Sequence, residues 1–308
     1  MAVAALVNAV ARRAILAAAG SPRVRRLVGR HGMRLGAARF VAGETLDEAV
    51  GVLRGLNEQG LKANTTLLGE HVADRAETLA VVEAYELILE RLAAEGLRAN
   101  VALKLTHLGL LLDPELAYEN VSRLVAHAAG LGNFVRIDME ESRHVDATLE
   151  TYRRLRAAGH DNVGTVLQAY LYRSEADLDS LLPLAPNLRL VKGAYLEPPE
   201  VAYPQKADVD AAFLRLVERS LAGEGYTAVA THDERAIRHV LGLGAAGDRF
   251  ELQLLYGVRP QLQLDLARRG HSVLVATPFG PEWYPYLMRR LAERPANVGF
   301  FLRTLVRR

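Results

Sequence analysis

The sequence predicts an α/β protein, a distorted (βα)8 barrel with an N-terminal helical arm. From about residue 60 onward, short apolar runs of strand length alternate with longer amphipathic stretches, which is typical of parallel βαβ units. There are eight such runs, and eight βα units in about 250 residues match the size of a closed barrel. A doubly wound open sheet is the alternative, but it usually has fewer strands and an early Gly-rich phosphate turn, which we do not see here.

Residues 1–60 precede the eight units, and their pattern predicts a helical arm. Helices are expected at 2–19, 21–39 and 45–59. The first apolar stretch is interrupted by Asn8 and by Arg12 and Arg13, so it is too short to span a bilayer. Its charges follow the apolar residues, which is the wrong order for a secretory signal. We therefore divide the chain into an arm, 1–60, and a catalytic barrel, 61–308.

Each of the eight units pairs a short apolar run with the amphipathic stretch that follows it. The strands are expected at 64–70, 100–105, 134–140, 164–170, 188–193, 227–232, 250–255 and 272–277. The helices are expected at 73–95, 113–130, 143–158, 174–182, 208–223, 233–243, 259–269 and 281–293. The C-terminal ends of the strands then meet at one rim, where barrels of this kind place their chemistry.

The composition excludes several classes of function. The chain has 308 residues, and 50% of them are hydrophobic. Its formal net charge is +2, so it lacks the strong overall positive charge that would indicate nucleic acid as a partner. It has no cysteine, which excludes disulfides and zinc–thiolate sites and agrees with a reducing, cytoplasmic location. His232, Asp233 and Glu234 are a poor ligand set, so we expect no metal. The basic segment 22–34 can touch anionic lipid, although a solvated helix face is the plainer interpretation.

Polar residues gather at the predicted strand ends. They carry both signs of charge, and charged groups in such places are rarely buried without partners. One polar strand end alone is usually a cap or a turn, so the signal lies in the convergence of many on one rim. These residues are Glu70, Lys104, Asp138, Gln168, Arg189, Lys192, Thr231, His232 and Gln253.

The last predicted helix carries an unusual polar face. Its residues at i, i+3, i+4 and i+7 are Tyr286, Arg289, Arg290 and Glu293. That spacing normally carries an apolar stripe. Because the helix follows the eighth strand, its first turns lie near the rim, where Arg289 and Arg290 can clamp a carboxylate. A solvated face with exposed ion pairs is the alternative.

From the residues alone, both an enzyme and a binding protein stay open. Lys104 or Lys192 can serve as a Schiff-base nucleophile in a flavin-free barrel lyase or hydrolase, which requires a desolvated pocket. A non-catalytic binder that uses the basic arm is the third reading. The segment 242–247, "GLGAAG", follows a predicted helix, so it is weak support for a dinucleotide turn.

Eight motifs then add a family resemblance. They are "LLGE", "LKLTHLG", "VRIDMEES", "VLQAYLYR", "RLVKGAYLEP", "ATHDER", "FELQLLYGVR" and "YPYLMRRLAE". In this order they resemble the proline dehydrogenase family, flavin-dependent enzymes that oxidise L-proline to 1-pyrroline-5-carboxylate. The likeness covers about residues 40–300 and is greatest to the short bacterial single-function enzymes. It implies FAD over the strand ends, a quinone as electron acceptor, and peripheral contact of a cytoplasmic protein with the membrane.

The resemblance also implies how proline is held. Arg289 and Arg290 match the pair that binds the proline carboxylate, and Lys104 matches a lysine beside it. Glu293 matches the glutamate that supports this pair. Glu70 matches a glutamate that pairs with Arg289 as a lid. The residues that match the walls of the proline ring are Tyr195, Leu255 and Tyr286.

The roles next to the flavin follow from the same resemblance. Asp138 matches an aspartate of the catalytic site, and Arg189 matches the arginine near the flavin N5 atom. The other residues that match flavin contacts are Met139, Gln168, Lys192, Gly193, Ala194, Thr231, His232 and Gln253.

One position departs from the family pattern. The eighth strand usually ends in Tyr-x-Pro-x-Gly, with the tyrosine beside the substrate ring, and here the segment is "ATPFG". Ala276 therefore stands where the tyrosine is expected, which leaves space beside the ring. Hydroxyproline or another proline derivative becomes an alternative substrate, unless Phe279, Trp283 or Tyr284 fills the space.

Overall fold

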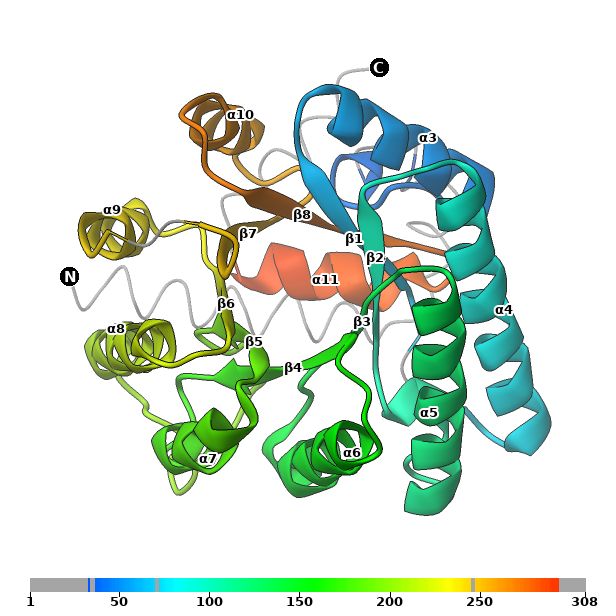
Figure 1. Ribbon diagram of the computed structural model, residues 1–308, viewed down its shortest axis with the longest axis horizontal. Coiled ribbons are helices and arrows are strands. Elements are labelled where there is room, and N and C mark those ends of the chain that lie inside the picture. Colours follow the sequence, from blue (N-terminus) through cyan, green and yellow to red (C-terminus); the bar gives the residue numbers. More distant parts are fainter. Residues whose placement is uncertain (1–32, 34–36, 70–71, 245–246, 294–308) are drawn as a thin grey trace.

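Eight parallel strands close into a barrel at the centre of the molecule (Figure 1). The computed structural model describes residues 33, 37–69, 72–244 and 247–293, with side chains in the last helix up to Met288. Each strand pairs with the next along the chain, and β8 pairs with β1 to complete the ring. The predicted fold class is therefore confirmed.

The strands lie where the apolar runs predicted them. They are β1 Lys62–Leu67, β2 Ala99–Leu103, β3 Val135–Ile137, β4 Val163–Gln168, β5 Asn187–Val191, β6 Tyr226–Ala230, β7 Phe250–Leu255 and β8 Val273–Phe279. Six of the predicted strands run two or three residues too far at their C-terminal ends. The chain leaves the sheet at those polar residues, and Lys104, Asp138 and Lys192 consequently stand on the rim just beyond their strands.

The helices also agree with the amphipathic pattern. They are α3 Leu46–Glu58, α4 Arg75–Ala94, α5 Pro114–Gly130, α6 Val145–Ala157, α7 Ser174–Leu181, α8 Lys206–Ala222, α9 Glu234–Gly242, α10 Pro260–Arg268 and α11 Trp283–Glu293. Short 3-10 helices are η1 Ala37–Arg39, η2 Thr106–Leu108, η3 Ser142–His144 and η4 Leu182–Leu184. Several helix starts are fixed by side-chain caps. The carboxylates of Asp74, Asp113 and Asp233 accept from backbone N–H groups in the first turns of α4, α5 and α9.

Helices α4 to α10 surround the strands, whereas α11 lies across the opening of the barrel (Figure 1). A second apolar cluster holds α11 in place against the chain around η1, and it contains Phe40, Val41, Leu68, Trp283 and Leu287. Trp283 also donates from Nε1 to Glu44 Oε1 at 2.6 Å. The segment before α3 and the last helix together therefore form a roof at one end of the barrel.

Several expectations fall on residues outside those described. They are the helix 2–19, most of the helix 21–39, Glu70, and the side chains of Arg289, Arg290 and Glu293. The third helix of the arm is confirmed as α3, which begins with a capping box between Thr45 and Glu48. Within the described ranges, no helix has the length and hydropathy needed to cross a bilayer.

Candidate active site

A cavity of about 600 Å³ opens at the C-terminal ends of the strands. Its walls come from strand ends, from the loop after β5, from α11 and from the segment near η1. It contains every predicted site residue whose side chain is described, although their individual roles stay predictions. These residues are Lys104, Asp138, Met139, Gln168, Arg189, Lys192, Gly193, Ala194, Tyr195, Thr231, His232, Gln253, Leu255, Ala276 and Tyr286.

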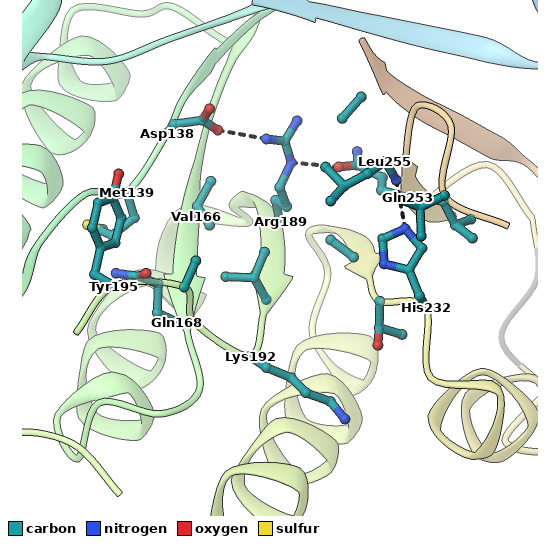
Figure 2. A pocket seen from close by; sticks show the side chains of 18 of the residues that line it. Asp138, Met139, Val166, Gln168, Arg189, Lys192, Tyr195, His232, Gln253 and Leu255 are labelled. Atoms are coloured by element: carbon teal, nitrogen blue, oxygen red, sulfur yellow. Dashed lines mark hydrogen bonds and ion pairs between the residues drawn. The ribbon is translucent and has the colours of Figure 1, made fainter. Parts of the chain in front are cut away.

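Arg189 is the best-anchored cation of this cavity. Its side chain is held by acceptors from three directions, as Figure 2 shows for two of them. The guanidinium donates to Asp138 Oδ1 at 2.6 Å, to Gln253 Oε1 at 2.6 Å and to Asn64 Oδ1 at 2.9 Å. Arg189 is only 8% exposed, so its charge is partly desolvated and fixed in direction. A fixed, buried cation of this kind acts strongly on any charge that develops beside it.

Lys192 belongs to a separate ionic cluster at the edge of the cavity. Its Nζ atom donates to Asp210 Oδ1 at 2.6 Å and to Asp233 Oδ2 at 2.8 Å, and it points away from Arg189 (Figure 2). Burial opposes the charge, but the bonds to both aspartates outweigh it, so the pKa of Lys192 is raised. The hydrogen bond from Lys192 lowers the pKa of Asp233 to about 2. A nucleophilic lysine needs the opposite shift, which disfavours a Schiff base at Lys192.

His232 is fixed in one tautomer by the next strand. The backbone N–H of Leu255 donates to His232 Nε2 at 2.9 Å (Figure 2). That nitrogen therefore carries no proton, and the proton of the neutral ring lies on Nδ1. Arg259 supports the same loop, since its Nη1 donates to the carbonyl of His232 at 3.0 Å and it pairs with Glu234. Arg259 has a φ of 54°, a left-handed conformation that is uncommon for a side chain of its size.

Glu140 joins the loops after β2 and β3 beneath the cavity. It is 3% exposed. Its carboxylate accepts from Thr106 Oγ1 at 2.6 Å and from the Thr106 backbone N–H at 3.1 Å, while its carbonyl accepts from Gln168 Nε2 at 2.8 Å. Burial raises the pKa of Glu140 to about 7, although the two bonds from Thr106 favour the charged form. The group therefore changes protonation near neutral pH while it positions the loop that carries Lys104.

Two glycines allow close approaches that shape the cavity. Gly193 has a φ of 117°, and a Cβ there would lie 2.3 Å from Cδ1 of Tyr170. Gly257 has a φ of 71°, and a Cβ there would lie 1.6 Å from the carbonyl oxygen of Arg39. Only glycine tolerates both the conformation and the contact. The second approach brings the neighbouring Phe40 to the cavity wall.

The family model named Proline dehydrogenase matches residues 49–303 of this chain. That match spans the barrel and every motif region described above. The chain belongs to the proline dehydrogenase family. The predicted resemblance is thereby confirmed, and the chain belongs among oxidoreductases.

Similar proteins of this family are found in several bacteria. The chain is 42% identical over 310 residues to "Proline dehydrogenase" of Deinococcus radiodurans, covering 98% of this chain and 100% of that protein. It is 42% identical over 282 residues to "Proline dehydrogenase 1" of Bacillus subtilis strain 168, covering 90% of this chain and 93% of that protein. Both are of the short type that the sequence predicted.

A solved structure supports the fold. The barrel is similar to proline utilization A (PutA) from Bdellovibrio bacteriovorus inactivated by N-propargylglycine, with a TM-score of 0.77 and 25% sequence identity. The likeness covers 83% of this chain but 32% of that much longer protein.

The proline dehydrogenase motifs did not reveal every residue that shapes the site. Sequence reasoning missed the residues that support Arg189 and the loops from below or from the roof. Most of them are polar residues inside predicted strands, or residues that reach the site through contacts between segments far apart in the sequence. They are Phe40, Asn64, Asn100, Glu140, Lys206, Glu251, Val258 and Arg259. Glu140, Glu251, Val258 and Arg259 lie inside the quoted family motifs, where no role was assigned to them. The alternation of Glu251 and Gln253 along β7 was a further signal, because it puts both on one face of the strand.

Proposed function

We propose that this protein oxidises L-proline to 1-pyrroline-5-carboxylate with FAD and passes the electrons to a quinone. This is the first step of proline catabolism to glutamate. The observation that carries the proposal is the ion pair of buried Arg189 with half-buried Asp138, which lies in one cavity with Tyr195, Leu255 and Tyr286. The names of the bacterial relatives support the substrate. The quinone implies that a cytoplasmic protein docks on the inner face of the cell membrane.

The residues of the cavity fit a flavin by their chemistry. The cavity is within the size range of small-molecule sites, and its lining combines apolar strand residues with a few directed polar groups. Arg189, Gln168 and Lys192 have N–H groups beyond those bonded within the protein, and the acceptor atoms of a flavin ring and of a diphosphate require such donors. Gly193 lines the cavity, and its missing Cβ makes room for the ring of Tyr170. FAD, when bound, supplies the acceptor for a hydride, which no side chain of the protein can provide.

The chain's own groups then position the substrate. Arg289 and Arg290 hold the carboxylate as a bidentate clamp, and the walls at Tyr195 and Tyr286 confine the ring. Proline loses a hydride from its Cδ carbon and a proton from its nitrogen, and the nitrogen electron pair closes the C=N bond. Arg189 places a positive charge where the electrons arrive, and Asp138 holds that charge in direction.

A broader substrate range is a second candidate, favoured by the register of β8. Ala276 pairs with Leu255 on one side and with Asn64 on the other, and it lines the cavity. Trp283 and Tyr284 are buried in the roof cluster instead, and neither they nor Phe279 are among the described residues that line the cavity. We therefore propose that the space beside the ring is open and admits trans-4-hydroxy-L-proline.

Anaerobic reduction of the bound cofactor tests the main proposal. The purified protein is expected to be yellow and to lose its flavin absorbance on addition of L-proline, with 1-pyrroline-5-carboxylate as the product. D-proline serves as the matched control, because it carries the same groups in the wrong arrangement for the clamp. A colourless protein, or a flavin that L-proline leaves oxidised, refutes the proposal. The second candidate, a broader substrate range, is tested by the ratio of the rates at which L-proline and hydroxyproline reduce the flavin.

A further inference from the structure

The side chains that hold Arg189 are themselves held by a lower layer of the barrel. Gln253 accepts from Arg189 with Oε1, and its Nε2 donates to Glu251 Oε1 at 2.6 Å. Asn64 accepts from Arg189 with Oδ1, and its Nδ2 donates to Asn100 Oδ1 at 2.5 Å. The same arrangement thus occurs twice, once from β7 and once from β1 with β2.

The chemistry of the groups dictates which way each amide points. A guanidinium has only donors, so the amide atom that faces it must be the oxygen. The NH₂ group then faces the lower layer and needs an acceptor there. A rotated amide would set NH₂ against the guanidinium and leave buried donors without acceptors, since Asn64 is 1% exposed and Gln253 is 3% exposed. The acceptor below each amide therefore stabilises the amide orientation in which the oxygen faces Arg189 and holds it.

We propose that Asn100 and Glu251 are positioning residues for Arg189, because each fixes from below the amide to which the guanidinium donates. Neither lines the cavity at the strand ends. Both line a second cavity of about 550 Å³ at the opposite end of the barrel. They act on the reaction through Arg189, so this inference rests on the proposed function.

Two variants that leave the net charge unchanged, Asn100→Ala and Asn187→Ala, separate this role from general damage to the barrel. Asn100→Ala removes the acceptor below Asn64 without a change of charge, and it opens onto an existing cavity and not onto a closed core. Asn187→Ala is the matched control. Asn187 also lines that cavity, but its side chain accepts from Arg136 and does not touch the support of Arg189. Asn100→Asp keeps an acceptor at the same atom and cannot rotate, so it should rescue.

Three readouts are expected to move together in Asn100→Ala. The rate constant of anaerobic flavin reduction by L-proline should fall roughly 5- to 50-fold, as small misplacements of a positioned group do. The proline concentration for half-maximal rate should change less than about twofold, because the clamp lies elsewhere. The flavin midpoint potential should become more negative, since a displaced cation favours the reduced, electron-rich cofactor less. Asn187→Ala should stay close to wild type in all three. Asn100→Asp should restore the rate constant and the half-maximal proline concentration, whereas its added negative charge makes the potential more negative by itself, so the potential is compared only between the two neutral variants.

Glu251→Ala provides a second test, because alanine leaves no acceptor below Gln253, and a purely electrostatic explanation predicts a shift of the opposite sign. Loss of a negative charge by itself would make the midpoint potential more positive. Loss of a fixed acceptor below Gln253 releases Arg189 and makes it more negative. A potential that rises or stays unchanged in Glu251→Ala overturns the proposal, and so does an Asn100→Ala protein that matches Asn187→Ala. Wild type is measured first: if L-proline does not reduce its flavin, the proposed function fails and the inference fails with it.

Discussion

The buried carboxyl of Glu140 predicts an unusual dependence of stability on pH. Its folded-state pKa is raised from 4.5 to about 7, mainly by burial. Between these two values the folded protein holds a proton that the unfolded chain has released. Stability is therefore lost as pH rises from about 4.5 to about 7, which is the reverse of the usual behaviour of a carboxyl group.

The size of the effect follows from the same pKa values. A difference of about 2.5 in pKa, at about 1.4 kcal/mol per unit, is on the order of 3 kcal/mol. Glu140→Gln should remove this loss. Glutamine can accept from the Thr106 backbone N–H with its oxygen and donate to Thr106 Oγ1 with its NH₂, so it reproduces the bonds of the protonated acid. The variant should match wild type near pH 4.5 and exceed its stability by up to about 3 kcal/mol near pH 8.

Urea unfolding at several pH values measures this difference. All proteins are compared in the same cofactor state, because a ligand that binds the folded form adds its own stabilisation. Thr106→Val provides a test of opposite sign. It deletes a hydrogen bond that favours the charged carboxylate, so it should steepen the loss of stability at rising pH. Parallel curves for wild type and Glu140→Gln from about pH 5 to about pH 8 would refute the assignment of a raised pKa.

Four further variants test the proposed chemistry. Asp138→Ala should reduce kcat/KM roughly 10- to 100-fold with the barrel and flavin content intact, because Arg189 loses a 2.6 Å partner at the rim; full activity would make Asp138 a structural residue. Arg289→Lys and Arg290→Lys should each weaken proline binding by roughly 1–3 kcal/mol, since a point charge replaces a bidentate fork; the half-saturating proline concentration checks this, and unchanged values remove the clamp. Ala276→Tyr should raise the ratio of kcat/KM for L-proline over hydroxyproline, and an unchanged ratio means that Ala276 does not border the ring.

The fold was predictable because its signal is local. Each strand of the barrel is a short apolar run, and each outer helix has one apolar face and often a side-chain cap, as with Asp113 before Pro114. The strand ends were less predictable, since Lys104 and Asp138 follow apolar residues without a break in the sequence pattern. Whether such a residue continues the strand or leaves it depends on the closure of the barrel, which a local pattern does not contain.

The site was predictable where motifs carry it and unpredictable where distant contacts do. Family motifs supplied Asp138 and Arg189, whereas Phe40 reaches the cavity through an approach between Arg39 and Gly257, 218 residues apart. Asn64 was visible as a polar residue within a strand. A polar residue on a strand is normally read as solvent-facing, and only the closed ring turns it inward.

The interior of this barrel is more polar than its fold requires. Small residues on the neighbouring strands make room for its large polar side chains. Barrels of this type are usually filled by branched apolar side chains, yet here β3 and β5 send the cations Arg136 and Arg189 inward. The partners of Arg136 in register are Ala102 and Gly164, and a Cβ on Gly164 would lie 2.3 Å from Arg136 Nη1.

Burial lowers the pKa of Arg136. Its Nη1 atom donates to the carbonyl oxygens of Thr165 and Asn187 at 2.9 and 2.8 Å, whereas its buried Nε atom has no hydrogen-bond partner among the described residues. Buried ion networks rarely stabilise a fold more than apolar residues of equal volume would. Arg136 is not part of the support of Arg189, which comes from Asn64 and Gln253 and from Asn100 and Glu251 below them. An apolar filling at those four positions would leave nothing to hold the direction of Arg189. This polar layer therefore fits the role proposed for Arg189, because a cation acts on a reaction at the rim only if the residues beneath it keep it in place.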